Sequence, residues 1–233
     1  MIALQCRTGV FTRLMVLAAV LCLGASCATK PARYQDLASS AQLRVNGDNA
    51  DGRVPFNTAI EPSALKAYTF VTLDPVRIYR GKDGQFGTLS EDAKNDLARH
   101  AEVRFRAELA RRGLLAAAVG PRTLRLKITL TGVETNVPVL GTSTKVTPVG
   151  FALSGLRSVR DKEGRFTGAV IYAGELFDAA SGRLVYAFVT RQYPNALNIP
   201  AGILPLDAAL AGLDRGATVT ASSLQSMMSG ASR

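Results

Sequence analysis

The sequence predicts an α+β (α/β) fold, in which a mixed sheet of four to five strands carries two helices on one face. A strand–helix–strand unit spans residues 68–131, a β-hairpin spans residues 165–193, and a helical period occupies residues 206–228. Strands joined by a helix pair in parallel through a right-handed crossover, whereas hairpin strands are antiparallel. The expected order is therefore strand, helix, strand, an optional strand, strand, strand, helix.

The first strand is expected over residues 68–80 (YTFVTLDPVRIYR), where β-branched and aromatic side chains predominate. Asp74-Pro75 must interrupt its ladder, because proline has no N–H to donate. We therefore expect a bulge or an edge position there. Residues 81–84 (GKDG) have the composition of a turn.

The first helix is expected over residues 90–112. Ser90 can cap its N-terminus, basic residues end it, and Gly113 provides a C-terminal stop. Apolar residues that recur every four positions form its buried stripe. They are Leu97, Ala101, Phe105 and Leu109.

Residues 123–131 (TLRLKITLT) alternate strictly between apolar and polar side chains, which predicts a half-buried strand with one wet face. The following segment, 136–158, is apolar, contains no acidic residue, and holds three glycines and two prolines. It is either a covered loop with short strands or an exposed apolar surface that meets a membrane or a partner.

Residues 165–177 and 184–193 are two further strands, and the Asp-, Ser- and Gly-containing residues 178–182 join them as a hairpin. The last helix is expected over residues 206–228. Its glycines and its Thr/Ser content weaken it, so a break near Gly216 is possible. Its shared apolar face consists of Leu206, Leu210, Leu213, Ala217, Leu224 and Met228.

Residues 1–26 have the layout of a secretory signal peptide. Two arginines precede an apolar run at residues 14–23, and that run is too short to span a bilayer as a helix. Small residues then lead to Cys27, which resembles a bacterial lipobox with a diacylated cysteine, although Gly24 stands where Leu is usual. The alternatives are ordinary cleavage near Ser26 and a retained membrane anchor.

Ala28, not Asp, follows Cys27. By resemblance to the sorting rule of Gram-negative lipoproteins, this favours the outer membrane, with the protein on its periplasmic face. Residues 27–66 are expected to be the acylated N-terminus and a tether, part of which could pack on the domain. Residues 67–233 are expected to form a single periplasmic α+β domain.

The chain has 28 Lys and Arg against 18 Asp and Glu, and 47% of its residues are hydrophobic. The apolar fraction excludes a wholly disordered chain. One His, and three Cys all before residue 28, exclude a His/Cys zinc site in the body and a disulfide scaffold. In an envelope location the basic charge favours lipid head groups or an anionic glycan over nucleic acid, unless it serves only solubility.

The sequence has no convincing pattern of nucleophile, base, metal ligand or phosphate-binding loop, so we expect no catalytic, cofactor or metal site. His100, the only histidine, is expected on the surface of the first helix. Glu175 is expected to face solvent or to pair with a cross-strand base such as Arg191, and Asp178 opens the turn. Two further groups carry no firm signal: the acidic residues Asp48 and Asp51 as a calcium site, and glycines 81, 84 and 87, which suit turns better than a phosphate loop.

Several motifs together resemble the domain-of-unknown-function-3313 lipoproteins of Gram-negative bacteria, over most of residues 60–228. Besides the lipobox and the strand at Tyr68, they are residues 85–87 (QFG), 120–126 (GPRTLRL), 175–178 (ELFD) and 181–182 (SG). The resemblance implies a location and a fold but brings no catalytic residue.

We therefore expect a non-enzymatic outer-membrane lipoprotein, anchored in the bilayer through acylated Cys27, whose periplasmic domain binds an envelope protein or an anionic glycan. An alternative is an oligomeric structural or pore-associated lipoprotein that uses segment 136–158. A more distant alternative is an envelope hydrolase.

Overall fold

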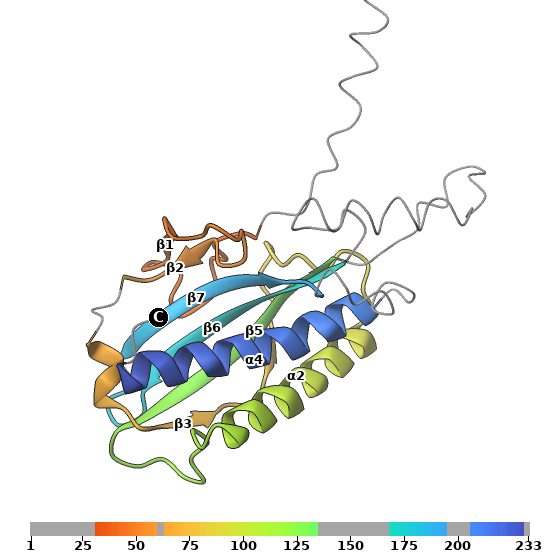
Figure 1. Ribbon diagram of the computed structural model, residues 1–233. Helices are drawn as coiled ribbons and strands as arrows, with labels where there is room; N and C mark the ends of the chain where they lie inside the picture. Colours follow the sequence, from red (N-terminus) through yellow and green to blue (C-terminus); the bar gives the residue numbers. More distant parts are fainter. Residues whose placement is uncertain (1–30, 60–62, 135–167, 195–205, 231–233) are drawn as a thin grey trace, which may run out of the picture. The chain divides into compact units, whose positions relative to one another are not determined.

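Seven strands form one mixed sheet in the computed structural model, which describes residues 31–59, 63–134, 168–194 and 206–230 (Figure 1). The strand order is β1-β2-β7-β6-β5-β3, and β4 also pairs with β5. The predicted α+β class and mixed sheet are confirmed, but the strand count exceeds the expected four to five. The strands are β1 (Arg44–Val45), β2 (Phe56–Asn57), β3 (Phe70–Leu73), β4 (Arg77–Ile78), β5 (Thr123–Glu134), β6 (Ala169–Asp178) and β7 (Leu184–Gln192).

The strand–helix–strand unit is confirmed. Helix α2 (Glu91–Arg111) connects β3 and β4 to β5, and both short strands pair with β5 in parallel. The interruption expected at Asp74-Pro75 falls between β3 and β4. Ser90 caps α2, since its side chain accepts a hydrogen bond from the Ala93 N–H. All four residues of the predicted stripe are buried in the core.

The hairpin is also confirmed. Strands β6 and β7 pair antiparallel around a turn in which Gly182 has a φ of +70°. Strand β6 also pairs antiparallel with β5, from Leu124 opposite Asp178 to Glu134 opposite Ala169. Strands β5, β6 and β7 are therefore the centre of the sheet.

Helix α4 (Asp207–Ser229) runs beside α2 on the same face of the sheet (Figure 1), and the break expected near Gly216 is wrong. A Cβ atom at Gly216 would lie 2.6 Å from the Tyr172 Oη, and one at Gly212 would lie 2.7 Å from the Gln192 carbonyl oxygen. The two glycines therefore allow the helix to approach the sheet closely. Their helix-weakening effect is offset by the burial that this approach permits.

Residues 31–59, which we call the strap, cover the opposite face of the sheet. Tyr172 faces the helices, where it contacts Phe105 and Thr220, so Glu175, three positions along β6, points to the other face. The Ser39 N–H of the strap donates to Glu175 Oε1 over 2.8 Å. Further along, the strap supplies β1 and β2 to the edge of the sheet beside β7 (Figure 1).

The strap bears on two sequence expectations. Of the tether expected over residues 27–66, the part from residue 31 to residue 59 packs on the domain, an option that the sequence left open: the compact unit begins at Pro31 and buries Tyr34, Leu37 and Leu43. We expected one face of β5 to be exposed to solvent. This is wrong along most of the strand, because Thr129 and Thr131 on that face are buried.

Three sequence expectations lie outside the described residues: the signal peptide over residues 1–26, Cys27, and segment 136–158. Among the residues that the structure does describe, no helix combines the length and the apolar character needed to cross a bilayer.

Candidate functional site

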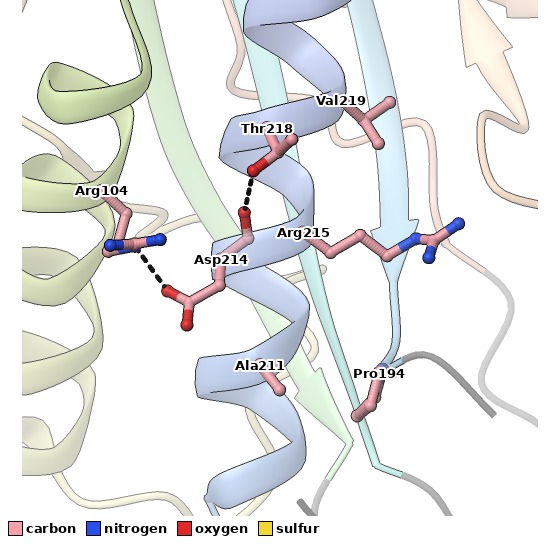
Figure 2. Close-up of a pocket in the computed structure, with 7 residues that line it drawn as sticks. All are labelled: Arg104, Pro194, Ala211, Asp214, Arg215, Thr218 and Val219. Carbon is pink, nitrogen blue, oxygen red and sulfur yellow. Dashed lines mark hydrogen bonds and ion pairs between the residues drawn. The ribbon is translucent and has the colours of Figure 1, made fainter. Parts of the chain in front are cut away.

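The outer side of α4 carries a shallow, open pocket of about 390 Å³ near the end of β7 (Figure 2). Helix α4 supplies most of the lining, with α2 contributing one residue and the chain after β7 another. The lining residues are Arg104, Pro194, Ala211, Asp214, Arg215, Thr218 and Val219.

Asp214 is the charged centre of this pocket. Its Oδ1 lies 2.9 Å from the Arg104 Nε and 2.8 Å from the Nε2 of His100, so it links α4 to α2. Thr218 donates its hydroxyl to the Asp214 backbone carbonyl at 3.1 Å, one helical turn back (Figure 2). Thr218 carries the only hydroxyl among the lining residues that the structure describes, and it donates that hydroxyl to the helix backbone. The arrangement of Asp214, Arg104 and His100 joins the two helices.

His100 is not simply a solvated surface residue, as the sequence suggested. Its side chain is 33% exposed and contacts the Asp214 carboxylate from α4. A local helical pattern cannot reveal this contact, because Asp214 lies 114 positions further along the chain.

Glu175 pairs with a cross-strand base, which was one of its two expected environments, but the base is Lys127 and not Arg191. It is fully buried under the strap, and its Oε2 lies 3.3 Å from the Lys127 Nζ on neighbouring β5. The expected pairing with Arg191 is wrong because Glu175 stands opposite Ala187, while Arg191 stands opposite Ile171, four residues along the sheet.

Arg191 instead belongs to a second charged cluster, at the end of the sheet where β7 finishes. It holds Glu134 through two contacts, Nε to Oε1 at 3.1 Å and Nη2 to Oε2 at 2.7 Å. The Arg53 guanidinium stacks 3.5 Å from the centre of the Tyr193 ring. Sequence reasoning missed this cluster, whose members come from the strap and from two strands.

Asp178 opens the hairpin turn, as expected. The Ser181 hydroxyl and backbone N–H both donate to its Oδ1 over 2.7 Å, and the Tyr68 hydroxyl donates to Oδ2 over 2.9 Å. These hydrogen bonds stabilise the carboxylate and lower the pKa of Asp178 to about 2. Asp178 therefore connects the hairpin turn to Tyr68, which lies in the chain that leads into β3.

The strap is anchored by two tyrosines, Tyr34 of the strap itself and Tyr79 just after β4. The Tyr34 hydroxyl donates to Gln85 Oε1 over 2.5 Å, and the Tyr79 hydroxyl donates to Asp83 Oδ1 over 2.6 Å. The two rings meet edge to face, with their centroids 5.2 Å apart. Burial raises the pKa of Tyr34 to about 12, and burial together with the hydrogen bond to Asp83 raises that of Tyr79 to about 12.

The remaining candidate residues, which are the two aspartates of residues 46–52 and the three glycines of residues 81–87, lie in turns. In residues 46–52, the Asp51 carboxylate accepts the Arg53 N–H, and Asp48 is exposed. Across the described ranges, no group of three or more His, Cys, Asp or Glu side chains could hold a metal ion. Among the three glycines, Gly84 donates to the Gly81 carbonyl and Gly87 has a φ of +55°. The glycines thus form turns, as the sequence favoured.

Comparison with known proteins gives distant structural likenesses and one family. The PelC dodecamer of Paraburkholderia phytofirmans has 15% identity and a TM-score of 0.37, covering 74% of this chain and 95% of its own. A DUF330 protein of Xanthomonas campestris has 13% identity and a TM-score of 0.34, covering 73% of this chain and 91% of its own. No curated protein matches significantly.

The family match covers most of the chain, including the strap, the sheet and most of α4. The profile of the family described as "Protein of unknown function (DUF3313)" matches residues 33–219. It thus begins in the strap, before the region over which the sequence motifs suggested the resemblance. This chain belongs to the DUF3313 family.

Proposed function

We propose that this protein is a lipid-anchored lipoprotein of the bacterial cell envelope, whose folded domain binds an envelope partner and catalyses no reaction. The observation that carries the proposal is the sequence of residues 14–27, an apolar run followed by Gly24-Ala25-Ser26 and Cys27. Such a run suits a secretory signal better than a membrane span. A diacylated Cys27 holds the protein stably, because two acyl chains anchor where a single chain binds only marginally.

The proposed location of the anchored protein is the periplasmic face of the outer membrane. Ala28 follows Cys27, in the position where Asp would favour the inner membrane by resemblance to the sorting rule of Gram-negative lipoproteins. The only cysteines besides Cys27 lie within residues 1–26, so the processed chain has no free thiol. This absence suits an oxidising compartment.

Binding rather than catalysis is supported by how the ionisable side chains are used. Asp214 links two helices, Glu175 secures the strap, and Asp178 holds the hairpin turn. Each of these carboxylates already has structural partners. The full sequence has a formal charge of +10, and removal of residues 1–26 takes away Arg7 and Arg13, which leaves +8. This positive charge supports an anionic partner, either an acidic face of an envelope protein or an anionic glycan.

A second candidate function is an oligomeric, structural or pore-associated lipoprotein. It is favoured by segment 136–158, whose sequence has no acidic residue and which follows Glu134 at the end of β5. Light scattering on the purified protein distinguishes the candidates. A stable oligomer that becomes monomeric when residues 137–156 are deleted favours the second, and a monomer in both cases favours the first.

The anchor itself is tested by metabolic labelling with palmitate in a Gram-negative host, followed by separation of the inner and outer membranes. The wild-type protein should carry label and sediment with the outer membrane. Cys27→Ala should lose both the label and membrane retention, whereas the matched variant Cys22→Ala should keep both. Equal labelling of wild type and Cys27→Ala would refute the proposal.

A further inference from the structure

One end of the sheet brings together the start of the folded unit and the ends of its central strands. Strand β5 finishes there at Glu134, opposite Ala169 at the start of β6, and β7 finishes beside them at Gln192. We call this the anchor end. The opposite end, which we call the turn end, carries the hairpin turn after Asp178.

The strap enters at the anchor end. The Ala32 N–H donates to Gln85 Oε1 over 3.2 Å, and Gln85 in turn forms a parallel bridge with Gly132, two residues before β5 finishes. The Gln85 N–H also donates to the Thr131 carbonyl over 2.8 Å. The first residues of the folded unit are therefore fixed to the last residues of β5.

Only a short piece of chain separates this point from Cys27. Four residue steps lead from Cys27 to Pro31, and a fully extended chain covers at most about 14 Å over that number. With the strap docked, an acyl-anchored Cys27 cannot hold the anchor end far from the bilayer. The turn end lies at the other end of the ten-residue strand β6, roughly 30 Å away.

We propose that the anchor end faces the lipid head groups of the membrane and that the turn end points away from them, toward the periplasm. This inference rests on the proposed lipid anchor and adds an orientation to it. The hairpin turn and the C-terminal ends of α2 and α4 are then the parts of the domain presented to a partner.

The chemistry at the anchor end fits an anionic bilayer surface. Arg33 is exposed immediately beside Ala32. Basic residues near a membrane are attracted to anionic lipid.

Energy transfer on the acylated full chain tests the orientation. Because the processed protein has no cysteine except Cys27, one new cysteine gives a single labelling site. Gln35→Cys marks the anchor end and Ala180→Cys marks the turn end, and both positions are exposed. Each variant carries a donor fluorophore and is reconstituted into phosphatidylethanolamine–phosphatidylglycerol vesicles whose head groups carry an acceptor.

Transfer from position 35 should be at least about twofold stronger than from position 180, because transfer falls steeply with the distance to the head groups. A flexible insert of about twenty Gly and Ser residues after Lys30 should reduce the difference, since it lets the domain tumble. Equal transfer with the native linker, or stronger transfer from position 180, would overturn the orientation while leaving the anchor intact. Absence of acylation on Cys27, read by mass spectrometry of the same samples, would overturn the anchor as well.

Discussion

Ser39 donates its backbone N–H to Glu175 Oε1 over 2.8 Å, although 136 positions separate the two residues in the sequence. The contact fixes the strap to the centre of the sheet and places a fully buried carboxylate next to Lys127. A buried carboxylate needs such partners, because the free energy of desolvating an unpaired charge is large. Glu175 therefore couples the strap to the stability of the whole sheet.

Replacing Glu175 with alanine should lower the free energy of unfolding by about 2 kcal/mol or more, because it leaves Lys127 and the Ser39 N–H without their partner. Urea unfolding of the purified protein measures the change. The matched control is Glu91→Ala, whose ion pairs with Arg80 and Lys94 are exposed and screened by solvent. A loss at Glu175 no larger than that at Glu91 would contradict the role given to this contact.

The core contact between α2 and the sheet gives a second prediction. Phe105 is fully buried and packs edge to face on Tyr172, with ring centroids 5.6 Å apart. Phe105→Ala should cost about 3 kcal/mol or more, because it leaves a cavity. Val103→Ala, an exposed position on the same helix, should change stability by less than about 0.5 kcal/mol. A loss below about 1 kcal/mol for Phe105→Ala would mean that this helix face is misassigned.

The close approach of α4 to the sheet gives a third prediction. Alanine is ordinarily the better helix former, by about 1 kcal/mol, yet Gly216→Ala should destabilise the protein, because its Cβ collides with the Tyr172 hydroxyl. Thermal unfolding measures the sign. Gly47→Ala, where an added Cβ meets nothing within 4 Å, should be close to neutral. A Gly216→Ala variant more stable than wild type would show that the helix can move away at no cost.

Tyr34 and Tyr79, which anchor the strap, predict how stability depends on alkaline pH. In the folded protein the pKa values of Tyr34 and Tyr79 are raised from 10.0 to about 12. The unfolded chain ionises these phenols at lower pH, so the stability they contribute is fully present below pH 10 and is lost as pH rises through about 12. Phenolate absorbance against pH, read beside circular dichroism, measures this.

Tyr34→Phe and Tyr79→Phe serve as controls for that titration. Each variant should remove one late-ionising phenol from the absorbance curve and weaken the alkaline dependence of stability. If all six tyrosines of the chain ionised together near pH 10 while the protein stayed folded, the burial of these two residues would be refuted.

The elements that the sequence predicted correctly are those that local patterns determine. The stripe of Leu97, Ala101, Phe105 and Leu109 depends only on helical spacing, and the hairpin depends only on its turn residues and flanking strands. The interruption at Asp74-Pro75 likewise follows from the missing N–H of proline. None of these inferences needs a distant part of the chain.

The misplaced residues are those whose environment is set by distant contacts. Glu175 meets Lys127 rather than Arg191, because the strand register decides which side chains share a neighbourhood. The strap buries Tyr34 against a loop about 50 positions away, which no local period shows. Gly216 weakens an isolated helix but fits a helix that lies against Tyr172. Tertiary contacts overrode local preference at each of these positions.

The proposed lipid anchor is tested most directly by the intact mass of the protein isolated from native membranes, with sequencing of its first peptide. A lipid-anchored protein should begin at Cys27 and carry a diacylglyceryl group on its thiol. A chain that begins elsewhere with an unmodified terminus, or a full-length species that retains residues 1–26, would contradict the proposed anchor.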